Sequence, residues 1–138
     1  MSEPTIEEKG APTGINILVV DDSAMMRTMI KRAAAATGLP IGNLYEAADG
    51  QQALAVLEQH HVDALFTDIN MPVMTGIELL RQIAGHERWQ NLVRVIISTD
   101  GSEARRTEAG ALGVRLYVGK PFRPEVMRDV LSELTTTR

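Results

Sequence analysis

The sequence predicts an α/β fold in which a doubly wound parallel sheet of five strands lies between five helices. Two observations support this prediction. Short apolar runs alternate five times with longer segments whose apolar residues recur every three or four positions. Several of the short runs are apolar on successive residues, as expected for strands covered by helices on both faces. This alternation favours right-handed crossovers between parallel strands.

The predicted strands are, in order, residues 15–20, 44–47, 62–67, 92–98 and 114–119. Four of the helices between and after them have a clear apolar stripe. These stripes are Met26, Met29 or Ile30, and Ala33; Ala53, Leu54 and Leu57; Ile77, Leu80, Ile83 and Ala84; and Met127, Val130, Leu131 and Leu134.

Several residues mark where the helices begin. Ser23 and Ser102 are candidate N-caps, and Thr75 with Glu78 reads as a capping box. Pro124 suits the first turn of the last helix, where an N–H would have no partner within the helix. The fourth helix, 103–112, has few apolar residues, so we expect it to be the least firmly docked.

Length and composition restrict the possible classes of protein. The chain has 138 residues, and we interpret 15–138 as one domain after a loose arm, 1–14, that is rich in Pro, Gly and acids. It has no cysteine, which excludes disulfides, and a formal net charge of -4, which disfavours direct nucleic-acid binding. No apolar run approaches the length of a membrane span and no secretory signal precedes the domain, so we expect a cytoplasmic protein.

Polar side chains follow four of the five predicted strands. Asp21 and Asp22 come after the first strand, Asp68 after the third and Lys120 after the fifth, while the fourth ends on Ser98. Ligands of open α/β sheets bind beyond the carboxyl ends of the strands, so these five side chains are expected to converge.

Three close carboxylates repel one another unless a cation neutralises them, and oxygen ligands alone favour Mg²⁺. A carboxylate nucleophile, a metal, a lysine and a hydroxyl donor are the groups needed for phosphoryl transfer onto Asp. A single Asp after a strand is more often a turn former or a helix cap, whereas the joint pattern is far more specific.

Three segments resemble the signature segments of the receiver domain of two-component response regulators. They are Val-Val-Asp-Asp-Ser at 19–23, Thr-Asp-Ile-Asn-Met-Pro at 67–72 and Gly-Lys-Pro-Phe at 119–122. The spacings between Asp22, Asp68, Ser98 and Lys120 are also close to those of the single-domain chemotaxis response regulators. The resemblance covers about residues 15 to 135 and implies a flavodoxin-like sheet with strand order 2-1-3-4-5.

The resemblance implies a role for each residue of the site. Asp68 would accept a phosphoryl group from the phosphohistidine of a sensor histidine kinase or histidine phosphotransfer protein. Asp22, Asp68 and the main-chain carbonyl of Asn70 would hold Mg²⁺, and Asp21 would assist through a metal-bound water. Lys120 would bond a phosphoryl oxygen, with Lys120-Pro121 as a cis peptide.

The resemblance also implies a switch. Ser98 would be the switch hydroxyl and Tyr117 the switch aromatic residue, and together they would alter the face formed by the fourth helix, fifth strand and fifth helix, where a downstream protein would dock. Asn70, Thr99 and Asp100 occupy modulating positions. The branched side chain of Thr99 replaces the usual Ala or Gly and predicts slow transfer from small donors, while small polar Asn70 and Asp100 predict a short-lived phosphoryl group.

Two other functions remain open on the sequence. A phosphohydrolase with an Asp nucleophile needs a second acid two positions after it, where this chain has Asn70, and also needs more chain for a substrate cap. A constitutive interaction module without phosphorylation leaves Lys120 unexplained. We therefore expect no enzyme beyond self-phosphorylation and autodephosphorylation.

Two groups of residues are not assigned to the site. Met25, Met26 and Met29 are expected to fill the core, with one of the three exposed near the site. His60 and His61 are adjacent in sequence, so they point in different directions and make a poor metal pair.

Overall fold

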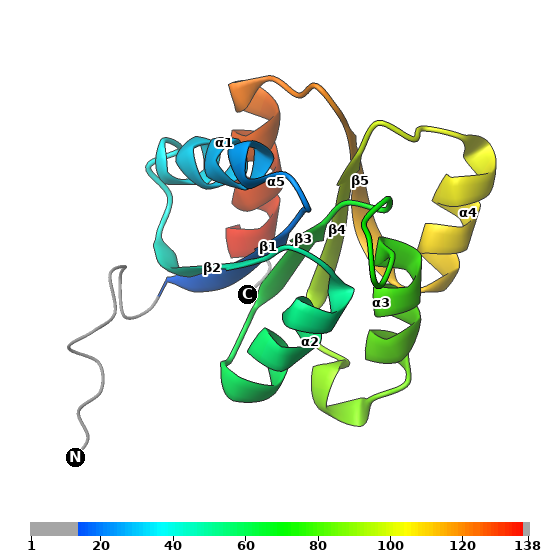
Figure 1. The fold of residues 1–138 in the computed structure, drawn as a ribbon. Coiled ribbons are helices and arrows are strands. Elements are labelled where there is room, and N and C mark those ends of the chain that lie inside the picture. The colour runs from blue at the N-terminus through cyan, green and yellow to red at the C-terminus, as the bar shows by residue number, and fades with distance from the viewer. Residues whose placement is uncertain (1–13, 137–138) are drawn as a thin grey trace, which may run out of the picture.

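The structure is a computed structural model that describes residues 14–136. The expected loose arm therefore lies, apart from Gly14, outside the described residues. The elements run in the order β1 (Ile15–Val20), α1 (Ala24–Ala35), β2 (Ile41–Ala47), α2 (Gly50–Gln59), β3 (Ala64–Thr67), α3 (Gly76–Ala84), the short 3₁₀ helix η2 (Glu87–Trp89), β4 (Val93–Ser98), α4 (Glu103–Ala111), β5 (Val114–Gly119) and α5 (Pro124–Thr136), as Figure 1 shows.

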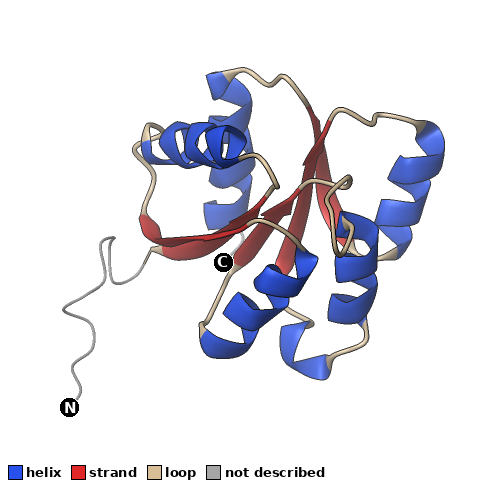
Figure 2. Ribbon diagram, in the orientation of Figure 1, coloured by secondary structure: helices blue, strands red, loops and turns tan. Residues whose placement is uncertain are grey.

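The five strands form one parallel sheet in the order β2-β1-β3-β4-β5, which confirms the predicted fold class and strand order. Figure 2 shows the sheet between two groups of helices. Strand β2 begins at Ile41, three residues before its predicted start. It lies at the edge of the sheet, where Ile15 pairs with Ile41. Main-chain pairing extends the strand beyond the apolar run from which its start was predicted, because it does not depend on the side chains.

Two apolar clusters, one on each face of the sheet, form the core. Helices α1 and α5 pack on one face against β1, β3 and β4 residues such as Val19 and Phe66. Helices α2, α3 and α4 cover the other face, where Leu18 and Leu65 belong to the same cluster of buried residues as Leu80 of α3. The core residues of the central strands are almost inaccessible to solvent, as expected for strands covered on both sides.

The predicted helix starts are confirmed. The side chains of Ser23 and Ser102 accept hydrogen bonds from Met26 N and Arg105 N. Thr75 and Glu78 form both bonds of the capping box. These caps satisfy main-chain N–H groups that have no partner within a helix.

The methionines of α1 are more exposed than expected. Met25 is 74% exposed and Met29 is 51% exposed, so two of the three methionines face solvent and not one. Ile30, at 3% exposure, and Ala34, at 2%, are the residues that α1 places in the core, and Met26 packs against the same cluster. Met25 and Met29 are four residues apart and share the outer face of the helix.

Arg94, near the start of β4, is buried at 7% exposure. Its guanidinium donates to the main-chain carbonyls of Trp89, at 3.0 Å, and Leu112, at 3.4 Å. Burial lowers the pKa of Arg94, and its Nε atom has no hydrogen-bond partner in the part of the chain that the structure describes. Arg94 therefore joins the end of η2 to the C-terminal end of α4.

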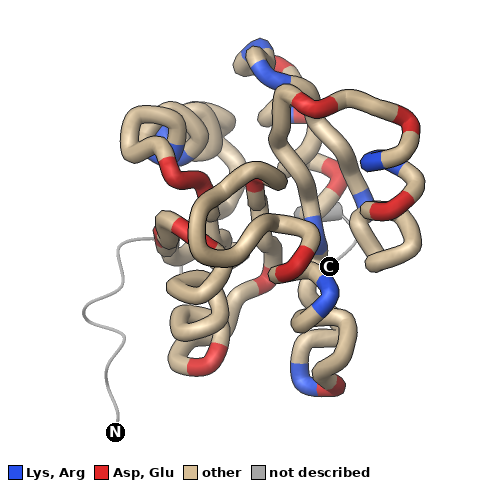
Figure 3. Tube along the Cα trace, turned by 45° about the vertical axis from the view of Figure 1, so that its right-hand side comes forward, with Lys and Arg blue, Asp and Glu red and all other residues tan. Residues whose placement is uncertain are grey.

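Within residues 14–136, no helix combines the length and the apolar character that crossing a bilayer requires. Basic and acidic residues are interspersed along the trace in the view of Figure 3.

Candidate functional site

The five polar residues identified from the sequence lie at the C-terminal ends of the strands. Asp21 and Asp22 follow β1, Asp68 follows β3, Ser98 ends β4 and Lys120 follows β5. Because β1, β3, β4 and β5 are consecutive neighbours in the sheet, these ends lie side by side. This is the position at which open α/β sheets bind ligands.

The ammonium group of Lys120 bridges two carboxylates. Its Nζ atom is 2.7 Å from Asp21 Oδ2 and 3.0 Å from Asp68 Oδ2. The three side chains are only 11%, 3% and 12% exposed in the order Lys120, Asp21, Asp68. Burial alone would lower the pKa of Lys120, but hydrogen bonds to and charges of the two acids outweigh it and raise the pKa.

The second oxygen of each of these carboxylates accepts a main-chain hydrogen bond. Asp21 Oδ1 accepts from Ser23 N at 2.9 Å, and Asp68 Oδ1 accepts from Ile69 N at 2.7 Å. Charge-assisted bonds of this kind restrict the side-chain rotamers. The two acids are thus held on both sides, by the lysine and by the loops that begin at the strand ends.

Asp21, Asp22 and Asp68 form a possible metal site. Each offers one carboxylate oxygen, and the three oxygens lie within 4.8 Å of one another. In the described range 14–136 this is the only such group of three or more His, Cys, Asp or Glu residues. A purely carboxylate set fits a hard divalent cation such as Mg²⁺. Asn70 is exposed two residues beyond Asp68, and the role of its carbonyl as a ligand stays a prediction.

The predicted switch residues are linked through Asp100. Ser98 is fully buried, and its Oγ atom accepts a hydrogen bond from Asp100 N at 3.1 Å. The hydroxyl of Tyr117, which is half-buried, donates to the main-chain carbonyl of Asp100. Burial, with the nearby Asp100 charge, raises the pKa of Tyr117. Thr99, between Ser98 and Asp100, is exposed.

The peptide bond between Lys120 and Pro121 is cis, as the resemblance implied. Lys120 N also donates to the carbonyl of Ser98 at 2.9 Å, so the ends of β4 and β5 stay paired up to the site.

Two residues that hold the site together were not assigned to it from the sequence. A Cβ atom on Gly76 would lie 2.0 Å from the main-chain oxygen of Asp68, so only glycine allows α3 to begin this close to the loop. Arg27 donates from Nη1 to the main-chain carbonyl of Asp21 at 2.6 Å. Gly76 stands inside the capping-box motif, which could have drawn attention to it, whereas nothing local in the sequence distinguishes Arg27.

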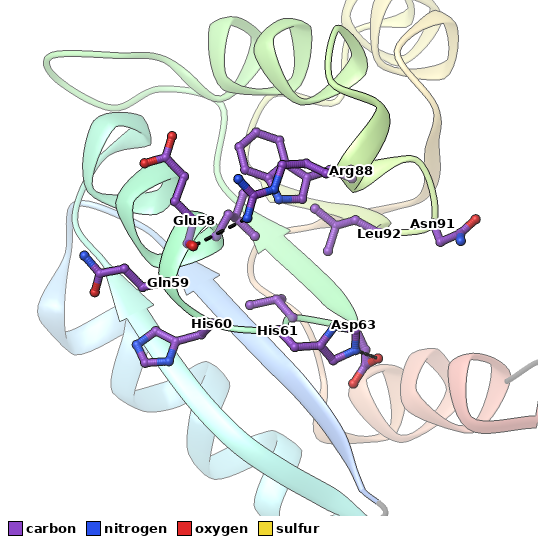
Figure 4. A pocket seen from close by; sticks show the side chains of 11 residues that line it. Glu58, Gln59, His60, His61, Asp63, Arg88, Asn91 and Leu92 are labelled. Carbon is purple, nitrogen blue, oxygen red and sulfur yellow. Dashed lines mark hydrogen bonds and ion pairs between the residues drawn. The ribbon is translucent and has the colours of Figure 1, made fainter. Parts of the chain in front are cut away.

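A pocket of about 480 Å³ lies at the opposite end of the sheet, before the starts of β3 and β4. Figure 4 shows His60 and His61 pointing to different sides of it, with His61 paired to Asp63 and Arg88 reaching the carbonyl of Glu58. This agrees with the expectation that the side chains of the two adjacent histidines point in different directions.

Comparison with known proteins identifies the family. A family model described as the response regulator receiver domain matches residues 17–132. The chain belongs to this family. Chemotaxis protein CheY of Pseudomonas aeruginosa is 38% identical over 120 residues, covering 87% of this chain and 95% of that protein. Chemotaxis protein CheY1 of Helicobacter pylori is 33% identical over 124 residues, covering 89% and 98%.

Solved receiver structures have the same fold. The chemotaxis response regulator CheY4 of Vibrio cholerae superposes with a TM-score of 0.79 at 30% identity, covering 88% of this chain and 99% of that one. A Francisella response regulator receiver domain gives 0.79 at 25% identity, covering 91% and 100%. The protein is thus a CheY-like receiver domain of two-component signalling, a class that acts in signalling and not as a conventional enzyme.

Proposed function

We propose that this protein is a response regulator that accepts a phosphoryl group on Asp68 from the phosphohistidine of a sensor histidine kinase or a histidine phosphotransfer protein. The observation that supports this most directly is the largely buried Lys120 ammonium between the carboxylates of Asp21 and Asp68. A lysine at this place holds the acids together and can bond a phosphoryl oxygen as it transfers.

In the proposed reaction a carboxylate oxygen of Asp68 attacks the phosphorus atom. The new O–P bond forms as the N–P bond of the phosphohistidine breaks, and the released imidazole takes up a proton from solvent. Asp22, Asp68 and the carbonyl of Asn70 would hold Mg²⁺, with Asp21 acting through a water. When bound, this ion supplies positive charge that offsets the repulsion between the acids and the phosphoryl oxygens.

Phosphorylation then changes how the protein docks. The added phosphoryl oxygens would attract the hydroxyl of Ser98, and Tyr117 would turn into the space beneath α4. The face of α4, β5 and α5 would then contact an unidentified protein target, in the cytoplasm and with no direct nucleic-acid partner. The small polar side chains of Asn70 and Asp100 leave water a path to the phosphoryl group, so we expect autodephosphorylation to be rapid and the phosphoryl group to be short-lived. We also expect Thr99 to slow transfer from small donors.

The test is intact mass after incubation with Mg²⁺ and phosphoramidate or acetyl phosphate. Wild type should gain a single labile phosphoryl group, and Asp68→Asn should gain none. Asp129→Asn, which removes an exposed acid on α5 far along the chain, is the matched control and should behave as wild type. Chelation of the divalent cation should prevent the mass increase.

The same experiment separates the two other functions. Repeated hydrolysis of organic phosphates, lost in Asp68→Asn, would instead indicate a phosphohydrolase. No mass change in wild type under any donor would indicate an interaction module that is not phosphorylated.

A further inference from the structure

Helix α4 has little apolar contact with the rest of the protein. Ala109 is its one buried residue, while Ala104 and Ala111 are exposed. Leu112, at its C-cap, is only partly buried. Core packing therefore contributes little to the position of this helix, and other interactions must define it.

Charged side chains form a continuous chain along α4. Asp100 Oδ2 is 3.5 Å from Arg105 Nε, and Arg105 Nη1 is 2.9 Å from Glu108 Oε1. The other oxygen of Glu108 is 2.6 Å from Nη2 of Arg81 on α3. The carboxylate of Glu108 thus joins two guanidinium groups, and the chain runs from the loop after β4, along α4, to α3.

One end of this chain is bonded to the switch hydroxyl. Asp100 N donates to Ser98 Oγ, and the Asp100 carbonyl accepts from Tyr117. The guanidinium of Arg106 lies 4.5 Å from the centre of the Tyr117 ring. If the hydroxyl of Ser98 moves toward Asp68, Asp100 N loses its acceptor unless the loop and the start of α4 follow.

We propose that Arg105 and Glu108 are positioning residues that hold the loop 98–102 and α4 in the arrangement described here. This inference rests on the proposed function, because the holding matters only if phosphorylation of Asp68 displaces the loop. The charged chain then sets how readily the phosphorylated arrangement is reached. The ion pairs that form it are those of Arg81, Asp100, Arg105 and Glu108.

The expected size of the effect follows from the exposure of these side chains, which is 58% for Arg81, 40% for Arg105 and 30% for Glu108. Exposed ion pairs shift an equilibrium by only about twofold to fivefold each. An effect of this size would not change the position of a helix that is held by many buried side chains. It is large enough to change the populations of two arrangements of α4, which buries only one residue.

The decisive variant is Glu108→Gln, which removes the central charge and keeps the size of the side chain. We expect it to be phosphorylated by phosphoramidate about twofold to fivefold faster than wild type at low salt. Raising NaCl from about 0.05 M to about 0.5 M should remove this difference, because salt screens the pairs in wild type. Amide resonances of residues 98–108 in the variant should lie between those of wild type before and after phosphorylation.

Glu133→Gln is the matched control. Glu133 pairs with Arg115 on β5 at 3.4 Å and does not belong to the series of ion pairs that joins Asp100, Arg105, Glu108 and Arg81. It should match wild type at both salt concentrations. Arg81→Gln, which leaves α4 unchanged, should shift the rate in the same direction as Glu108→Gln, and it serves if the latter fails to fold.

The outcomes distinguish this inference from the proposed function. If wild type is phosphorylated on Asp68 but Glu108→Gln and Arg81→Gln match it in rate and resonances, the positioning role is wrong and the proposed function stands. Equal acceleration in Glu133→Gln would likewise overturn the inference. If wild type takes no phosphoryl group, both fail.

Discussion

Helices α3 and α4 are both nine residues long and begin in the same way, yet they are attached to the protein differently. Thr75 and Ser102 cap them with the same hydrogen bond to the third residue of the helix. Helix α3 then buries five residues, whereas α4 buries only Ala109. The two helices therefore share their length and the N-cap bond, and they differ in how many residues they bury against the rest of the protein.

The two helices border the same site. The start of α3 is fixed against Asp68, because Gly76 N donates to the carbonyl of Ile69 at 2.8 Å. The start of α4 follows the loop that contains Asp100 and is tied mainly by charged side chains. The site thus has one rigid border, which preserves the geometry of the acids, and one border that can be displaced at low cost in free energy.

The strongest test of this difference compares the same substitution in the two helices. Leu80→Ala in α3 removes a fully buried side chain and should lower the free energy of unfolding by about 2–5 kcal/mol. Leu112→Ala at the end of α4, where the side chain is only partly buried, should cost less than half as much. Urea unfolding measures both, and equal losses would contradict the comparison.

Glycine substitutions give a smaller effect. Gly76→Ala places a methyl group against the main chain of Asp68, so it should destabilise the protein by about 1–3 kcal/mol and slow phosphorylation. Gly85→Ala is the control, because its Cβ would meet only ordinary contacts of 3.6 Å and 3.7 Å. Urea unfolding and the phosphoramidate assay measure the two effects. A Gly76→Ala variant with the stability and the phosphorylation rate of wild type would contradict this expectation.

In α4 the same substitution should act in the opposite direction. A Cβ on Gly110 meets no atom within 4 Å, so Gly110→Ala gains helix propensity without a clash. We expect it to raise the free energy of unfolding by about 0.5–1 kcal/mol. A destabilised Gly110→Ala in thermal or urea unfolding would mean that α4 packs more tightly than described.

The smallest effect concerns Glu46 of β2, whose carboxylate pairs with Arg27 and Lys31 of α1. Hydrogen bonds from Lys31, then from Arg27, lower the pKa of Glu46 below its ordinary value of 4.5. Its contribution to stability is therefore complete above pH 4.5 and is lost as the pH falls through the lowered pKa. Because the side chain is 37% exposed, we expect less than about 1 kcal/mol.

The measurement is urea unfolding of wild type and Glu46→Gln at neutral pH and below the lowered pKa. The difference between the two proteins should narrow at the lower pH. A difference that is constant with pH would show that the two ion pairs contribute nothing measurable to the attachment of α1.

The sequence allowed the elements, the helix caps and the five residues at the strand ends to be predicted, because each depends on local periodicity or on position after a strand. The strand order came from the family resemblance and not from periodicity. The start of β2, the exposure of Met25 and the proximity of Gly76 to Asp68 depend on strand register, helix rotation and close main-chain contact. None of these is set by neighbouring residues in the chain, and the same holds for the pairing of Glu108 with Arg81.

Buried Arg94 fixes the far end of α4, because its guanidinium donates to the carbonyl of Leu112. Helix α4 is about 13 Å long, and because it is held at its C-terminal end it would rotate about that end and not slide along its axis. A tilt of about 10° would move the N-terminal turn by about 2 Å while leaving Leu112 almost in place. The displacement would therefore be greatest beside Asp100 and would decrease along the helix. The centre of rotation would lie near Leu112, at the end of the sheet opposite the site.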